Sequence, residues 1–268
     1  MFENDTDRFD QHFLIDENTI NTFIEEANLS KKDIVVEIGP GKGQITSLIA
    51  PKVKKLICIE LDERLKSYLK KIQDKYKNID IIYSNVLEEY IPECNKIITS
   101  LPYSIIEPFI NKLLKCKFDE IIMIIGKRYA DGVINNELNK LSLLTNCYFK
   151  ATYIMDIPPE YFNPSPRVMS AMIKLVPISD RQIKDFNLLI FRYMFYYRDK
   201  KVRNALMESL IRSFEIVNNP ITKRISKDII NNLEIEEELL NKLFSTCSND
   251  EIVYLNKKLK KVKVKGDN

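Results

Sequence analysis

Hydrophobic residues along the first 176 positions alternate between short β-branched runs and longer stretches with helical spacing. The runs have the length of buried strands, and the stretches place apolar side chains on one side and charged ones on the other. Strands that alternate with helices are typical of a mostly parallel sheet covered on both faces. The predicted strands are 34–38, 56–60, 79–83, 96–99, 120–125, 152–157 and 168–176.

Helices are expected between the first five strands. Residues 61–76 illustrate the pattern, because Leu61, Leu65 and Leu69 recur at helical spacing with lysines on the other side. The last two strands follow one another without a helix between them. The proline-rich stretch 157–166 that separates them fits a hairpin-like connection.

Beyond Pro177 the strand pattern stops and only helical periodicity remains. This change predicts two domains, an α/β domain over residues 1–177 and a small all-helical domain over residues 178–268. Within the second domain, helices are expected at 186–197, 202–214, 236–244 and 250–261.

The composition is that of an ordinary globular protein, with 45% hydrophobic and 29% charged residues among 268. It excludes a disordered, fibrous or disulfide-stapled chain. No apolar run approaches the roughly 20 residues that cross a bilayer, and the acidic start with Glu3, Asp5 and Asp7 differs from a basic signal peptide. A cytoplasmic protein with no membrane partner is expected. Because no long apolar surface stripe is evident, we expect a monomer.

The numbers and spacing of the cysteines and histidines further limit the kinds of site that the chain can form. The five cysteines are scattered and never form a C-x-x-C pair, and His12 is the only histidine. This pattern indicates neither a disulfide framework nor a zinc site, so no metal is predicted and the cysteines are expected to be reduced core residues. A Ser-His-Asp hydrolase would require His12 as its base.

Positive charge is concentrated in the C-terminal third. Residues 1–180 carry 23 Lys and Arg against 26 Asp and Glu, whereas residues 181–268 carry 18 against 12. The basic residues peak in 192–203 and in 257–265, which holds six lysines. Such runs neutralise phosphates without reading sequence, so nucleic acid is a natural partner. For the terminal run alone, a solubilising tail is an equally good interpretation.

Three of the six glycines, Gly39, Gly41 and Gly43, lie directly after the first predicted strand. Glycines there permit left-handed backbone and close approach of N–H groups to a ligand. The spacing differs from the dinucleotide fingerprint and lacks the ending of a P-loop. Glu60 ends the second strand 21 residues after Gly39, where a carboxylate accepts hydrogen bonds from ribose hydroxyls. The pair predicts an adenosine-type ligand; the alternative is a tight turn with a surface glutamate.

The four residues 100–103, Ser-Leu-Pro-Tyr, follow the fourth predicted strand. Open α/β folds place their active sites at this edge of the sheet. The ring of Tyr103 offers a stacking face for a flat base, and the hydroxyl of Ser100 offers an acceptor for an exocyclic amine. The alternative is a proline-stiffened turn packed into the core.

Taken in order, five segments resemble the KsgA family of ribosomal RNA adenine dimethyltransferases. The match extends over nearly the whole chain, includes residues 195–206 of the helical domain, and leans towards the archaeal or eukaryotic branch. The resemblance implies an α/β, Rossmann-like class I methyltransferase fold, with a mostly parallel seven-stranded sheet and a small C-terminal all-helical domain. The segments are Gln11–Asp16, Glu37–Gly43, Glu60, Ser100–Tyr103 and Phe162–Ser170.

The resemblance also implies a function, which is dimethylation of adenine amines in small-subunit ribosomal RNA with S-adenosylmethionine as the methyl donor. The small ribosomal subunit would be the partner and residues 178–268 would bind it. The implied catalytic residues are Ser100, Leu101 and Tyr103. The implied cofactor-binding residues are His12, Leu14, Gly39, Gly41, Glu60, Asn85 and Ser100, with the ribose on Glu60 and the adenine near Asn85.

Three positions depart from the family pattern. Ser100 stands where the family usually has Asn, Asn85 where it has Asp, and residues 125–129 differ from its Gln-Lys-Glu-type run. These departures keep two alternatives open, an assembly factor with weakened catalysis and a paralogue that methylates another substrate. For His12, capping of the N-terminal segment is an alternative to cofactor contact. The aromatic residues of 191–197 fit either base stacking or a helix core.

Overall fold

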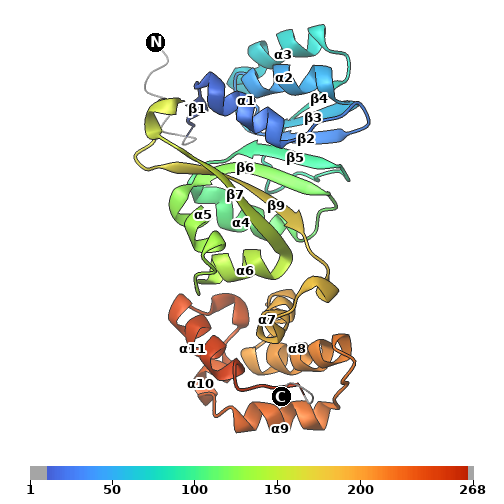
Figure 1. Ribbon diagram of the computed structural model, residues 1–268, viewed down its shortest axis with the longest axis vertical. Helices are drawn as coiled ribbons and strands as arrows, with labels where there is room; N and C mark the ends of the chain where they lie inside the picture. Colours follow the sequence, from blue (N-terminus) through green and yellow to red (C-terminus); the bar gives the residue numbers. More distant parts are fainter. Residues whose placement is uncertain (1–10, 265–268) are drawn as a thin grey trace. The chain divides into compact units, whose positions relative to one another are not determined.

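The computed structural model describes residues 11–264, which divide into two compact units (Figure 1). The first unit contains the chain as far as Asp131, together with Ala151–Pro177. The second unit contains Gly132–Lys150 and the chain from Ile178 onwards. The acidic residues of the first ten positions and Lys265 lie outside the described residues.

A seven-stranded sheet with the order β4-β3-β2-β5-β6-β9-β7 runs through the first unit. The pairs β3/β4, β2/β3, β2/β5 and β5/β6 are parallel, whereas β6/β9 is antiparallel. The expected mostly parallel seven-stranded sheet is therefore confirmed, and each predicted strand is present. The strands are β2 (Ile34–Ile38), β3 (Lys55–Glu60), β4 (Ile79–Tyr83), β5 (Lys96–Ser100), β6 (Glu120–Gly126), β7 (Phe149–Ile157) and β9 (Ser170–Pro177).

Helices cover both faces of this sheet, with α1, α2 and α3 on one face and α4 and α5 on the other (Figure 1). The central strands are consequently buried on both sides, as Val35 and Val36 of β2 show with no exposed surface. This double burial explains why the strands are continuous apolar runs. The helices are α1 (Glu17–Glu26), α2 (Gln44–Ile49), α3 (Lys66–Lys75), α4 (Ile106–Leu113) and α5 (Lys127–Ile134), and the 3₁₀ turns are Ala50–Lys52, Glu63–Leu65, Tyr103–Ile105 and Pro159–Tyr161.

One predicted helix is wrong. Residues 84–95, between β4 and β5, form turns without a helix. Asn85 closes the first turn, because its Oδ1 accepts from the Leu87 N–H at 3.0 Å, and Pro92 has no N–H to offer a helix. The helix expected over 61–76 begins only at Lys66, because the side chain of Asp62 accepts from the Arg64 N–H and starts a 3₁₀ turn.

Two short strands that periodicity does not predict, β1 (Phe13–Leu14) and β8 (Phe162–Asn163), form a separate antiparallel pair. Phe13 lies opposite Asn163, and Leu14 lies opposite Phe162. The Ile15 N–H continues the pairing by donating to the Tyr161 carbonyl at 2.8 Å. The proline-rich connection between β7 and β9 thus holds the N-terminal segment in place.

The strand order changes direction at β2. The chain runs from β2 through β3 to β4 on one side, and then returns to β5 on the other side of β2. Helices leave for opposite faces at such a point, so the carboxyl ends of β2 and β5 border a crevice. The glycines after β2 and Ser100 at the end of β5 lie at this edge.

The second unit is helical, as predicted, but it begins earlier in the chain than the expected boundary at residue 178. Residues 132–150 belong to it because α6 packs against α7: Tyr148 Oη donates to the Arg192 carbonyl at 2.7 Å, and Arg192 Nη1 donates to the Cys147 carbonyl at 2.6 Å. Its helices are α6 (Lys140–Tyr148), α7 (Phe186–Tyr196), α8 (Val202–Ile216), α9 (Lys223–Asn232), α10 (Glu237–Asn241) and α11 (Asn249–Leu259), with 3₁₀ turns at Asp180–Gln182 and Phe244–Thr246.

Aromatic residues of α7 form much of the helical core. Phe191 and Phe195 are buried, and the Phe195 ring meets the Phe244 ring edge-on at 5.2 Å. Tyr193 is tied down through its hydroxyl, which donates to Asp180. Tyr196, in contrast, is 71% exposed. The core interpretation of this segment is therefore confirmed for both phenylalanines.

Candidate functional site

The glycine loop, residues 39–43, connects β2 to α2 at the crevice. Gly39, Gly41 and Gly43 have φ values of +70°, +60° and +83°. L-residues with a side chain rarely adopt this left-handed region, so the glycines are needed for the backbone path itself. The loop is also closely packed, because a Cβ on Gly43 would lie 2.1 Å from Ile72 Cδ1.

Glu60, at the end of β3, faces the same crevice and is only 3% exposed. Its Oε2 accepts from the Gly41 N–H and its Oε1 from the Asp62 N–H, both at 2.9 Å. Burial raises the pKa of Glu60, and these two backbone hydrogen bonds oppose that effect. The carboxylate therefore ties β3 to the glycine loop, and Glu60 is also one of the residues that line the cavity at this crevice.

Glu37 lies in β2, just before the glycine loop, and is 2% exposed. The Cys58 thiol of the neighbouring strand lies 3.5 Å from its Oε2 as a donor. Burial raises the pKa of Glu37 to about 7. That pKa is the net result, in which side-chain hydrogen bonds from Thr46 and Cys58 oppose the effect of burial and the nearby charge of Glu60 adds to it. Glu37 is thus a buried carboxyl group that is partly protonated near neutral pH.

The N-terminal segment closes one side of the site. His12 Nδ1 lies 2.8 Å from the Pro164 carbonyl oxygen, an arrangement in which the ring N–H donates. His12 also lines the cavity described below, so one side chain anchors the segment and borders the site. Lys42 lies over the Phe13 ring, 4.8 Å from its centre, and a Cβ on Gly41 would come within 3.0 Å of that ring.

The Ser-Leu-Pro-Tyr turn, residues 100–103, forms the other side of the site. The Leu101 N–H donates to the Ile124 carbonyl at 3.3 Å, which holds the turn against β6. The Tyr103 hydroxyl and the fully buried Ser170 Oγ are 2.6 Å apart. A Cβ on Gly126 would lie 3.3 Å from the Tyr103 ring, so the absence of a side chain at Gly126 leaves room for the ring to pack there. Tyr103 is thereby fixed at both its ring and its hydroxyl.

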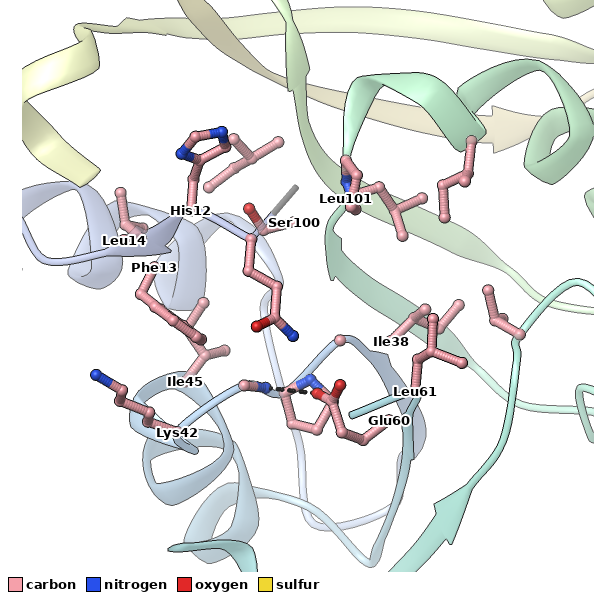
Figure 2. A pocket seen from close by; sticks show the side chains of 18 of the residues that line it. His12, Phe13, Leu14, Ile38, Lys42, Ile45, Glu60, Leu61, Ser100 and Leu101 are labelled. Carbon is pink, nitrogen blue, oxygen red and sulfur yellow. Dashed lines mark hydrogen bonds between the residues drawn. The ribbon is translucent and has the colours of Figure 1, made fainter. Parts of the chain in front are cut away.

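One cavity joins these parts. Figure 2 shows His12 on one side of it, Glu60 on the opposite side and Ser100 between them. Eight of the nine residues proposed from the sequence line this cavity, namely His12, Leu14, Gly39, Gly41, Glu60, Ser100, Leu101 and Tyr103.

Asn85 is the residue that the structure does not bring to the cavity. Its neighbours Ser84 and Val86 line the cavity. The Asn85 side chain instead accepts from the Leu87 N–H and donates from Nδ2 to Glu88 Oε1 at 3.2 Å. The expected contact of Asn85 with an adenine stays a prediction.

Several cavity residues were not predicted individually. Leu61 is apolar, follows Glu60 and is 51% exposed at the cavity rim. The sequence shows only an apolar residue directly after the acidic end of a strand, and the exposure of Leu61 is visible only in the structure. Others come from segments far apart in the chain, and most of them lie within the segments that carry the family resemblance, although no role was assigned to them there. They include Phe13, Ile38, Val86, Phe162 and Ser170.

Two further properties concern possible metal and membrane contacts. Among residues 11–264, the structure shows no group of three or more His, Cys, Asp or Glu side chains placed to hold a metal ion. Within the same range, none of the helices has both the length and the apolar character needed to span a membrane.

All five cysteines are free, and four of them are buried, as expected for reduced core residues.

The sheet order and the site define the Rossmann-like class I methyltransferases. A crystal structure of a dimethyladenosine transferase from Plasmodium falciparum has this fold, with a TM-score of 0.64, 24% identity and coverage of 92% of this chain and 98% of that one. The family model for ribosomal RNA adenine dimethylase matches residues 2–246. The chain therefore belongs to the ribosomal RNA adenine dimethylase family.

Two curated relatives come from archaea, in agreement with the archaeal side of the expected branch. Both are named probable ribosomal RNA small subunit methyltransferase A. The protein from Methanococcoides burtonii is 36% identical over 240 residues, which cover 87% of this chain and 85% of the relative. The protein from Methanosarcina acetivorans is 34% identical over 255 residues, which cover 90% and 94% respectively.

Proposed function

We propose that this protein uses S-adenosylmethionine to dimethylate the exocyclic amines of adenines in small-subunit ribosomal RNA. The observation that carries the proposal is the single cavity in which Glu60 and the glycine loop face the Ser-Leu-Pro-Tyr turn. The first two parts suit a nucleoside cofactor, and the third suits a flat base with an amine. Family membership and the names of the archaeal relatives support the same reaction.

The residues present fit this cofactor. Glu60 offers carboxylate lone pairs to ribose hydroxyls, while its hydrogen bond to Gly41 keeps the loop backbone close. Leu61 and Val86 provide apolar surface beside Glu60 for an adenine ring. His12, Leu14 and Gly39 border the cavity towards Ser100, where the methionine portion would lie.

The chain's contribution to methyl transfer is positioning. S-adenosylmethionine, when bound, supplies an electrophilic methyl group on a sulfonium sulfur. The Tyr103 ring stacks on the target adenine, and Ser100 accepts a hydrogen bond from its amine, which orients the nitrogen lone pair. The bound cofactor would supply its methyl group to this lone pair, with the sulfonium sulfur leaving as a thioether and the amine proton passing to water.

The test is transfer of labelled methyl groups to small ribosomal subunits that lack the modification, followed by mass spectrometry of the nucleosides. We expect dimethyladenosine. Cofactor binding without any transfer would favour the alternative of an assembly factor with weakened catalysis, for which Ser100 in place of Asn is the motivating observation. Transfer only to other RNA would favour a paralogue with another substrate. Failure to bind S-adenosylmethionine would contradict all three.

Ser170 is proposed as a positioning residue for Tyr103. Replacing Ser170 with alanine removes the 2.6 Å hydrogen bond but leaves the Tyr103 ring in place. We expect kcat to fall about fivefold, the equivalent of one neutral hydrogen bond of roughly 1 kcal/mol, with an unchanged Kd for S-adenosylmethionine. Steady-state kinetics and calorimetric titration measure the two quantities.

The control for Ser170 is a double-mutant cycle with Tyr103→Phe, which removes the same hydrogen bond from its other side. Each single variant should lose the same activity, and the double variant should lose no more than either. Additive losses would contradict a shared role. If each variant loses thermal stability along with kcat, the hydrogen bond has a merely structural role.

The remaining assignments rest on the same proposal. The helical domain over residues 178–268 is proposed to bind the small ribosomal subunit, since it carries the excess of basic residues. A monomer in the cytoplasm, without a membrane partner, also remains a prediction.

A further inference from the structure

Gly126, the last residue of β6, differs from the glycines of the glycine loop. Among residues 11–264, the glycines with a positive φ are Gly39, Gly41 and Gly43, so the backbone at Gly126 has a conformation that a residue with a side chain can adopt. Gly126 also belongs to the run of residues 125–129 that departs from the family pattern. The role of this glycine therefore lies in the absence of a side chain, not in its backbone.

A side chain on Gly126 would meet the face of the Tyr103 ring. A Cβ there would lie 3.3 Å from Cδ1 of the ring, 3.5 Å from Cγ and 3.6 Å from Cε1. These nearly equal distances place the Cβ over the ring face, because an approach to the ring edge would leave the two flanking atoms clearly farther away than the nearest one. Tyr103 lines the cavity, whereas Gly126 does not. Gly126 thus lies behind the ring, which presents its opposite face and its edges to the cavity.

The sheet fixes the ring in this place. Gly126 and Ser170 are register partners on β6 and β9, and the Tyr103 hydroxyl lies 2.6 Å from Ser170 Oγ. The ring therefore extends across this pair of residues. Ser100 is the register partner of Ile124 on β6, two residues before Gly126, so Ser100 and Gly126 share one face of the sheet. Two departures from the family pattern, both with little or no side chain, consequently lie on this face beside Tyr103.

Dimethylation makes a specific demand on this part of the cavity. After the first transfer, the amine of the target adenine carries a methyl group in place of a hydrogen. The nitrogen becomes pyramidal in the second transfer, and the methyl group that it already carries bends away from the incoming one. As in the first transfer, the sulfonium sulfur leaves as a thioether and the amine proton passes to water. The second transfer therefore needs room for one carbon more than the first, and one carbon in a packed pocket changes discrimination by roughly 10- to 200-fold.

We propose that Gly126 is a specificity-determining residue, whose missing side chain keeps room beside Tyr103 for an adenine that already carries one methyl group. The inference rests on the proposed function, because it requires a target adenine against the Tyr103 ring. A side chain at position 126 would press on the covered face and move the ring a few tenths of an ångström towards the cavity. The space around the amine would then be narrower, and the second transfer would suffer more than the first.

The experiment compares Gly126→Ala with the wild type and with a control, Val176→Ile. Val176 lies on β9, is exposed and does not line the cavity, so the control also adds one carbon to a strand of the same sheet. Unmethylated small ribosomal subunits react with S-adenosylmethionine for increasing times, and mass spectrometry quantifies monomethyladenosine and dimethyladenosine. The time courses give separate rate constants for the first and the second transfer. Thermal unfolding and calorimetric titration of the cofactor report on the fold and on the cofactor site.

We expect the ratio of the second rate constant to the first to fall about tenfold in Gly126→Ala, so that monomethyladenosine accumulates. The first rate constant and the Kd for the cofactor should change little, and Val176→Ile should keep the wild-type ratio. Gly126→Ser, with a larger side chain than alanine, should lower the ratio at least as much.

An unchanged ratio in Gly126→Ala, or an equal fall in both rate constants, would overturn the inference while leaving the proposed function intact. Loss of folding or of cofactor binding in this variant would overturn it as well, because Gly126 would then serve the structure. A wild type that produces only monomethyladenosine would overturn the inference and restrict the proposed function to a single transfer. A wild type that methylates no adenine would overturn both proposals.

Discussion

Replacing Glu60 with alanine should weaken S-adenosylmethionine binding by about 100-fold. A hydrogen bond to a charged group contributes roughly 1.5 to 3 kcal/mol, and a ribose offers two hydroxyls to this carboxylate, so a loss of about 3 kcal/mol is expected. The loss has a second source in this chain. Because Glu60 Oε2 accepts from the Gly41 N–H, alanine also releases the glycine loop from β3. Calorimetric titration of the cofactor measures the effect.

The matched control is Glu63→Ala, which removes an exposed carboxylate three residues away. It should leave the Kd for the cofactor unchanged. An unchanged Kd in the Glu60 variant would contradict the ribose assignment. Thermal unfolding of both variants without ligand shows how much of the effect comes from the released loop.

Replacing Glu37 with glutamine should alter the pH dependence of stability. The pKa of Glu37 is about 7 in the folded protein, against 4.5 for an ordinary glutamate, because the group is buried. The folded state therefore retains a proton that the unfolded state releases. The contribution of Glu37 to the stability of the wild type is fully present below about pH 4.5, falls as the pH rises from there, and levels off above about pH 7. The difference between the two pKa values corresponds to roughly 3 kcal/mol.

Glutamine is nearly isosteric and does not titrate in this range. The free energy of unfolding of Glu37→Gln, relative to wild type, should therefore rise by about 3 kcal/mol between pH 4.5 and pH 8. Urea unfolding at several pH values measures it. All other groups titrate in both proteins, so the difference reports Glu37 together with its coupling to Glu60 and Cys58. The exposed Glu63→Gln should run parallel to wild type, and a parallel profile for Glu37→Gln would contradict a raised pKa.

Parts of the site that depend on neighbouring residues were predictable. The glycines and Glu60 each lie at the end of a strand, and parallel strands end at the same edge of a sheet. Their meeting therefore follows from the strand pattern alone, and Gly41 and Glu60 are indeed hydrogen-bonded. The prediction of a helix between β4 and β5 is wrong because the side chain of Asn85 closes a turn there. The spacing of the apolar residues does not reveal this turn.

Other parts depend on residues far apart in the chain. The pairing of β1 with β8 joins segments about 150 residues apart through only two residues on each side, too few for a periodic pattern. Ser170 meets Tyr103 only because β9 pairs antiparallel with β6 and begins beside Gly126, where β6 ends. Residues 132–150 read like part of the α/β domain, yet α6 buries its apolar side chains against α7.

The sequence by itself determined the seven strands of the large sheet, the two-part architecture, the family and eight of the residues that line the cavity, because apolar periodicity and glycine conformation act over a few neighbouring residues. Only the tertiary structure decided which side chains enter the cavity, as Leu61 does and Asn85 does not. It also decided the burial of Glu37 and the packing of the Tyr103 ring on Gly126. Burial and side-chain contacts depend on how elements distant in sequence pack against one another, and no local pattern encodes that packing.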